Sequence, residues 1–180
     1  MNAIFKGLRP FDYVLAALAT VAGVFLMYEN ISGSDHGLPH PQSTTTAAML
    51  PVFLLVTVPI LWRRRNILAV TAVTTAALAL HVLLFGWETR CGVVLPLSAA
   101  LAYAVGRFAT GRREHLLSLA IIVLLQVVTL ARDSSIDTIG SALPIAVVGA
   151  ALCYGIGRFV QVKVSKKERE EQPAAEVVTV

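Results

Sequence analysis

Residues 50–84 read LPVFLLVTVPILWRRRNILAVTAVTTAALALHVLL, which is two apolar segments of helical length joined by a short basic turn. The turn contains three consecutive arginines, Arg63, Arg64 and Arg65. A charged side chain at the centre of a bilayer costs roughly 2.5 to 3.5 kcal/mol, so the turn must lie at a water interface with a membrane span on either side. Because basic loops stay on the cytoplasmic side, this hairpin sets the orientation of the rest of the chain.

The composition of the whole chain is also that of a membrane protein. Of its 180 residues, 56% are hydrophobic and 14% are charged, and the mean hydropathy is +0.72. A soluble domain has about 25% charged residues, so too few polar side chains are present here to cover a water-soluble surface. The formal net charge is +4, but the basic residues lie at the ends of apolar runs. We therefore expect the lipid bilayer, with its anionic head groups, as a partner and no nucleic acid.

Hydropathy along the chain predicts an all-α fold, a polytopic bundle of six transmembrane helices within residues 10–160. Each apolar run has about the 20 residues that are needed to cross the hydrocarbon. Pro51 and Pro59 predict a kink in the second span, and Asn66 is a suitable N-cap for the third. The predicted spans are 11–28, 47–62, 66–85, 91–108, 115–131 and 138–160, with an N-terminal segment, 1–9, before them and a partly disordered tail, 161–180, after them.

The distribution of basic residues predicts that both termini are cytoplasmic. With six spans, thirteen of the fifteen lysines and arginines fall on one side, and only Arg90 and Arg132 fall on the other. This imbalance is the positive-inside pattern and favours an even number of spans. The arginines that we expect to anchor the spans at the cytoplasmic lipid head groups are Arg63, Arg64, Arg65, Arg107, Arg112, Arg113 and Arg158.

Two segments of the chain are similar to each other. Residues 103–108 read YAVGRF and residues 154–159 read YGIGRF. Small residues recur four apart in both helices, and such stripes let helix backbones approach closely in lipid. The similarity fits either a repeated pair of helices or convergence on a common exit pattern. The residues expected to pack against neighbouring helices or a second subunit are Ser98, Ala102, Gly106, Gly149, Cys153 and Gly157.

Polar residues near the external ends of the spans form the candidate ligand-sensing surface. His81 and Gln126 lie within apolar spans, where such residues usually make interhelical hydrogen bonds. Charged residues of the external turns could pair around an outward-facing pocket, and the set comprises His81, Glu88, Arg90, Arg132 and Asp133.

A metal site is a weaker interpretation of the first external loop. His36 and His40, with Asp35 beside His36, are residue types that bind zinc. A loop rich in glycine and proline with only two imidazoles is more readily explained as a solvated loop, so we predict no metal and no cofactor.

The sequence resembles the membrane input domain at the head of many actinobacterial sensor histidine kinases. The resemblance rests on the six spans, on the segment Pro59–Arg65 (PILWRRR), and on a last span that leaves the membrane through Gly157 and Arg158 into a charged helical tail. It implies a bacterial plasma membrane location and a signalling role. The chain departs from those kinases after the tail, where they continue into a phospho-accepting helix and an ATP-binding domain.

Nothing in the sequence predicts an enzyme. Aspartate and glutamate occur only at the ends of the spans, and neither a glycine-rich phosphate loop nor a set of metal ligands is apparent. Our first hypothesis is a non-enzymatic integral membrane protein that signals or regulates through helix packing with itself or with a membrane protein partner such as a histidine kinase. A small transporter or channel component, or a structural subunit of a membrane complex, remains the alternative.

Overall fold

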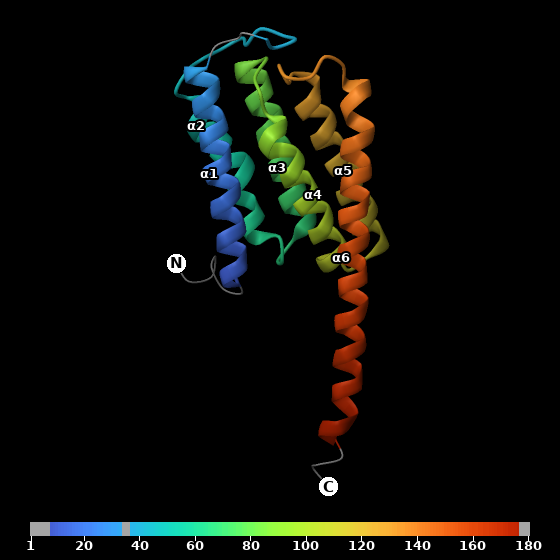
Figure 1. The fold of residues 1–180 in the computed structure, drawn as a ribbon. Helices are drawn as coiled ribbons and strands as arrows, with labels where there is room; N and C mark the ends of the chain where they lie inside the picture. Colours follow the sequence, from blue (N-terminus) through green and yellow to red (C-terminus); the bar gives the residue numbers. More distant parts are fainter. Residues whose placement is uncertain (1–7, 34–36, 177–180) are drawn as a thin grey trace.

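The computed structural model describes residues 8–33 and 37–176, with side chains up to residue 169, and in these ranges helices are joined by loops and turns. No β-strand occurs within them, so the predicted all-α class is confirmed for this part of the chain. The helices are α1 (Pro10–Ser32), α2 (Met49–Thr57) with the 3₁₀ helix η1 (Val58–Trp62), α3 (Ile67–Phe85), α4 (Cys91–Phe108), α5 (Arg112–Ala131) and α6 (Ile139–Glu176). They run side by side as one bundle (Figure 1).

Five of the helices, α1, α3, α4, α5 and α6, are long and apolar enough to cross a membrane. The remaining segment has nine residues in α2 and five in η1. At 1.5 Å and 2.0 Å per residue it measures about 24 Å, which is less than the roughly 30 Å of a typical hydrocarbon core. The architecture is that of a multi-pass membrane protein.

The helix bounds follow local sequence signals. Asn66 caps α3, because its side-chain oxygen accepts a hydrogen bond of 2.9 Å from the backbone N–H of Ala69. Gly86 ends α3 with a positive φ of 73°, which glycine adopts without strain. Where we expected a kink, the second segment changes from α to 3₁₀ geometry just before Pro59, which has no N–H for a helical hydrogen bond.

The largest difference from the predicted bounds is at α6. We placed the end of the sixth span at residue 160 and expected a charged helical tail after it. The helix α6 runs through this tail and also through Pro173, to Glu176, and has 38 residues in all. Lysine, arginine, glutamate and glutamine dominate this continuation, and these residues favour helix. The C-terminal part of α6 consequently extends well beyond the other helices (Figure 1).

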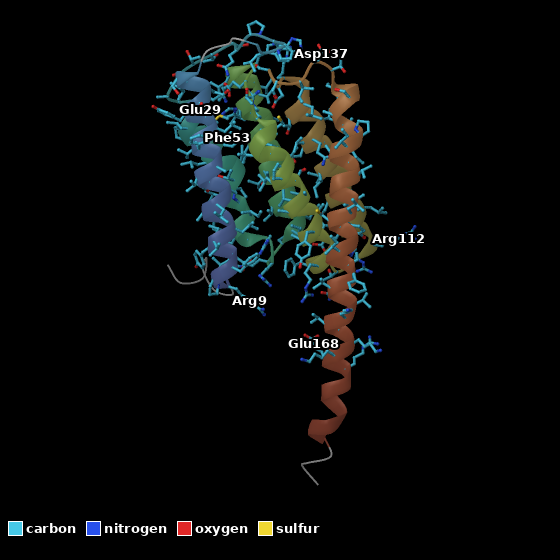
Figure 2. All side chains as sticks on the ribbon, in the orientation of Figure 1. Arg9, Glu29, Phe53, Arg112, Asp137 and Glu168 are labelled. Carbon is cyan, nitrogen blue, oxygen red and sulfur yellow. The ribbon has the colours of Figure 1, made fainter. Side chains whose placement is uncertain are left out.

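The bundle has two ends of different character. The basic end comprises residues 8–12, 63–66 and 107–114, and the loop end comprises residues 37–46, 86–90 and 132–138. Figure 2 shows Arg9 and Arg112 at the basic end, Asp137 at the loop end, and Glu168 on the part of α6 that projects past the basic end. The start of α1 and the extension of α6 therefore lie on the same side of the bundle.

α4 is the most buried of the five long helices and α6 the least. α4 packs most extensively against α6 and also contacts α5, α3 and α1. The outer face of α6 exposes large apolar side chains, which water would disfavour and lipid would accept. These side chains are Ile145, Val148, Leu152, Ile156, Phe159 and Val162.

Candidate functional site

The loop end holds a cluster of buried charges centred on Arg90, in the turn between α3 and α4. The side chain of Arg90 is fully buried. Its Nη2 donates a hydrogen bond of 2.6 Å to the carbonyl of Gly86, and its Nη1 donates one of 2.7 Å to the carbonyl of Arg132. The guanidinium thus joins the end of α3 to the turn that follows α5.

Glu88 and His81 complete the centre of this cluster, and both are fully buried. Oε2 of Glu88 lies 3.4 Å from Nη2 of Arg90 and 3.7 Å from Nδ1 of His81. Nε of Arg90 lies 3.4 Å from the same ring nitrogen. The structure therefore brings a carboxylate, a guanidinium and an imidazole into mutual contact where water is excluded.

Asp133, in the turn between α5 and α6, holds the start of α4. Its Oδ2 accepts hydrogen bonds from the backbone N–H groups of Arg90, at 2.7 Å, and Cys91, at 2.6 Å. Its Oδ1 accepts a bond of 3.0 Å from the backbone N–H of Ser135. A carboxylate at a helix N-terminus is favourable because it meets free N–H groups and the positive end of the helix dipole.

The two turns that carry these residues are also paired through their backbones. The N–H of Glu88 donates to the carbonyl of Arg132, and the N–H of Ser134 donates to the carbonyl of Glu88, both at 3.2 Å. This short parallel bridge between Glu88 and Asp133 fixes the spacing of α3, α4 and α6 at the loop end.

Residues 37–46 cross the loop end and bind to the same turns (Figure 1). The backbone N–H of Ser43 donates to the carbonyl of Trp87 at 3.0 Å. The ring of His40 stacks on that of Trp87, with centroids 4.1 Å apart. The guanidinium of Arg132 also lies over the Trp87 ring, at 5.1 Å, so the side chain of Arg132 is directed to this tryptophan, and only its carbonyl joins the charge cluster.

Sequence reasoning missed the contribution of Asn30, at the end of α1. Its side-chain amide exchanges two hydrogen bonds with the backbone of Thr89, at 3.0 and 3.1 Å, and also accepts one of 2.7 Å from Gln42. The sequence offers no signal for these bonds, because an asparagine near the end of an apolar run is equally typical of a helix cap.

The Asp35 and His36 of the weaker metal interpretation lie outside the described residues. Within the described part of the chain, no three metal-ligating side chains gather.

The electrostatics of the cluster centre on Glu88. Burial raises the pKa of Glu88 to about 7, although the nearby Arg90 guanidinium acts to lower it. Burial likewise lowers the pKa of Arg90, while Glu88 and Asp133 act to raise it. Among the described residues, no side chain or backbone group donates a hydrogen bond to either carboxylate oxygen of Glu88, because the approach of Arg90 at 3.4 Å is an ion pair without hydrogen-bond geometry. The Glu88 carboxylate is therefore held by charge alone and is suited to take up a proton near neutral pH.

A second buried charge cluster lies at the basic end, and sequence reasoning missed it. Asp12 of α1 is fully buried and receives hydrogen bonds of 2.8 to 3.0 Å from both Arg63 and Arg64. Arg63 is only 3% exposed, which corrects the expectation that its side chain reaches lipid head groups. These bonds attach the basic turn to α1, and the Asp12 carboxylate supplies the counter-charge that the buried guanidinium of Arg63 needs.

The other arginines of the basic end are more accessible. The guanidinium of Arg64 lies 4.7 Å from the ring centroid of Phe108, and that of Arg107 lies 5.6 Å from it. Arg107 also donates a hydrogen bond to Gln161 of α6. Four of the predicted anchors are exposed to the surroundings of the bundle, as an interfacial position requires: Arg65, Arg112, Arg113 and Arg158.

The small-residue stripes meet at one point. A Cβ added at Gly106 of α4 would overlap the backbone of α6 at Tyr154, and one added at Gly157 would overlap the backbone of α4 at Tyr103. The two similar segments therefore cross at their glycines. Gly149 has open space around it, so this member of the stripe makes no close approach within the described chain.

The rest of the stripe contributes through burial and a hydrogen bond. Ser98 and Ala102 are buried in α4, and Cys153 is half-buried in α6. Nε2 of Gln126 donates bonds of 3.0 Å to Oγ of Ser98 and to the carbonyl of Ala146, so it links α5 to both α4 and α6. Gln126 makes the interhelical contacts that its place in an apolar span predicted.

Comparisons with known protein families, with curated proteins and with solved structures found no match for this chain.

Proposed function

We propose that this is a non-enzymatic integral membrane protein with a signalling or regulatory role, in which the loop-end cluster receives a signal and α6 delivers it to a partner. The proposal places the protein in a bacterial plasma membrane, with the loop end outside and the basic end in the cytoplasm. The clustering of arginines at one end supports this orientation.

The proposed topology has six crossings, with α2 and η1 together forming the second. The start of α1 and the extension of α6 lie at the same end of the bundle, which supports an even number of crossings (Figure 1). The 24 Å length of the second segment fits a locally thinner bilayer or the added length of the residues that precede Met49.

The observation that carries the proposal is a continuous set of contacts from the charge cluster to α6. Asp133 binds the first N–H groups of α4, and it lies in the turn that leads into α6. At the other end of α4, Gly106 and Gly157 bring α4 and α6 into backbone contact. A change of charge at Glu88 or Arg90 would thus act on the start of α4, and the crossing at Gly106 and Gly157 would carry a shift of α4 to α6.

α6 has the properties of an output element. It continues as one helix from the bundle into the projecting extension. Ile145, Val148, Leu152 and Phe159 recur at spacings of three, four and seven residues and are 58 to 75% exposed. A stripe of this kind supports packing against a second helix, either from another copy of the chain or from a membrane protein such as a histidine kinase.

Cysteine crosslinking in native membranes tests the proposal. In a background with Cys91→Ala and Cys153→Ala, single cysteines are placed at Ile145, Val148 and Leu152, with Ala151→Cys as an exposed control off the stripe. We expect crosslinks at the stripe positions, either to a second copy of this chain or to a kinase. The yield of these crosslinks should change when Glu88→Gln is added.

The proposal would be contradicted if the cysteine at position 151 crosslinked as well as the stripe cysteines. It would also be contradicted if Glu88→Gln left the yields at the stripe unchanged. Solute flux in vesicles that contain only the purified protein would instead favour the transporter alternative.

A further inference from the structure

An apolar groove runs between α1 and α4 on the outside of the bundle. Its volume is about 220 Å³. Small side chains at Ala19 and Ala22 of α1 and at Gly92 and Ala100 of α4 form its walls, and Leu15, Leu18, Ile60 and Leu97 add apolar surface. α1 and α4 make few contacts along this groove, in contrast to α4 and α6.

The two ends of the groove have different surroundings. Toward the loop end, Gly92 lies against Leu26 of α1, where a Cβ would be 3.7 Å from the leucine side chain. Toward the basic end, Leu15 and Ile60 lie three and four residues from Asp12 and Arg64. The groove therefore leads along the bundle to the buried Asp12 cluster.

The charges at that end are unbalanced. One carboxylate, Asp12, pairs with the two guanidiniums of Arg63 and Arg64. Arg64 is the accessible member, with its side chain 23% exposed. The guanidiniums of Arg64 and Arg107 lie 4.7 and 5.6 Å from the ring centroid of Phe108, so two cations flank this ring where α4 reaches the basic end.

The spacing between groove and cations matches a lipid molecule. Along α4, the eight residues from Ala100 to Phe108 span about 12 Å, and the twelve from Pro96 span about 18 Å. A chain that starts at the head-group level and reaches the middle of the hydrocarbon covers about 15 Å. An acyl chain can thus lie in the groove while its phosphate remains at the arginines.

We propose that this groove holds one acyl chain of an anionic phospholipid whose phosphate lies against Arg64 and Arg107. The site is independent of the loop-end cluster and of the proposed partner of α6. Binding combines burial of the apolar chain with a charge-assisted contact between the phosphate and the arginines. In a zwitterionic lipid, the cation of the head group would weaken this attraction.

Lipid retention by the purified protein tests the site. The protein is exchanged from detergent into mixed micelles of phosphatidylglycerol or phosphatidylcholine with identical acyl chains, and the lipid bound to it is counted by native mass spectrometry. We expect at least threefold more bound phosphatidylglycerol than phosphatidylcholine. Equal retention, or an equal rise in thermal stability with inorganic phosphate alone, would overturn the proposal.

Matched variants separate the two parts of the site. Ala19→Phe fills the groove, whereas Ala17→Phe places the same ring on an exposed face of the same helix. We expect Ala19→Phe to lower retention of phosphatidylglycerol at least fivefold and Ala17→Phe to leave it unchanged. Arg107→Ala should lower the preference for phosphatidylglycerol at least twofold, while Arg112→Ala, an exposed arginine of the same end, should not.

Photo-crosslinking tests the site in the unmodified protein, so its result does not depend on whether a variant folds. Phosphatidylglycerol with a diazirine in the middle of one chain is bound to the unmodified protein and activated by light. Labels within residues 15–22 and 92–100 would support the site. Labels spread evenly over the exposed face of α6 would contradict it.

Discussion

Asp133 binds the N-terminus of α4 from a turn more than forty residues away, with its Oδ2 2.6 Å from the backbone nitrogen of Cys91. Because Arg90, the residue before α4, supplies no side-chain cap of its own, this carboxylate replaces one. The start of α4 and the start of α6 are thus held together by one side chain, and the stability of the loop end depends on its charge.

Asp133→Asn should therefore lower the free energy of unfolding by about 1 to 2 kcal/mol, because it removes the charge at the helix N-terminus while keeping the size of the side chain. Asp137→Asn is the matched control, since Asp137 is an exposed carboxylate in the same turn. Unfolding of both variants in detergent, followed by circular dichroism, measures the difference. Equal unfolding curves would show that the cap contributes nothing.

Glu88 should make stability depend on pH. The pKa of Glu88 in the folded protein is raised to about 7 by burial against the opposing effect of Arg90. The folded state consequently binds a proton more tightly than the unfolded state, so stability is highest at low pH and falls as pH rises from about 4.5 to 7. His81 and Arg90 face this carboxylate directly, and Asp133 lies on the neighbouring turn.

The comparison with Glu88→Gln isolates this effect. Between pH 4.5 and 7, unmodified protein should lose roughly 2 to 3 kcal/mol more than the variant, which has no proton to release. Denaturation at a series of pH values in one detergent gives both curves. Parallel curves would contradict the raised pKa.

Removing Asp12 should be more costly than removing any exposed acidic residue. Asp12→Asn leaves the buried guanidinium of Arg63 without its counter-charge, and breaking a buried ion pair from one side costs about 3 to 5 kcal/mol. The double variant Asp12→Asn with Arg63→Met should recover part of the loss, because no charge then stays buried. Chemical denaturation of the single and double variants provides the test, with Glu168→Gln as an exposed acidic control.

Gly157 and Gly149 make a matched pair within α6. Gly157→Ala should destabilise the bundle by about 1 to 3 kcal/mol, because the new methyl group would overlap the backbone of α4 at Tyr103. Gly149→Ala meets open space and should be neutral or stabilising by up to about 1 kcal/mol, since alanine favours helix. Thermal unfolding of the two variants decides the matter, and equal effects would argue against the close crossing of α4 and α6.

The sequence predicted helices and their boundaries well where hydropathy and capping act locally. α4 has the predicted bounds, and Asn66 caps α3 as expected, because an apolar run and a cap leave direct traces in neighbouring residues. The grouping of His81, Glu88, Arg90 and Asp133 followed from their shared place at one end of the predicted spans, and the structure brings these four side chains together.

Contacts between distant segments were not predictable in the same way. Asp12 has the position of a helix cap and does bond to the N–H of Arg9, yet its main partners are Arg63 and Arg64, some fifty residues away. Asn30 likewise bonds to Thr89 across the bundle. Such pairs depend on which helices become neighbours, and neither hydropathy nor spacing within one helix contains that information.

The unbroken course of α6 has a mechanical consequence. From its crossing with α4 at Gly157 to its end at Glu176, the helix covers about 29 Å of rise. If the crossing acts as a pivot, a tilt of about 10° would displace the tip by roughly 5 Å, which is close to one helical turn. Because Ile139, at the opposite end of the bundle, lies about 27 Å of rise from the same crossing, a displacement there would reach the tip at nearly its full size and in the opposite direction.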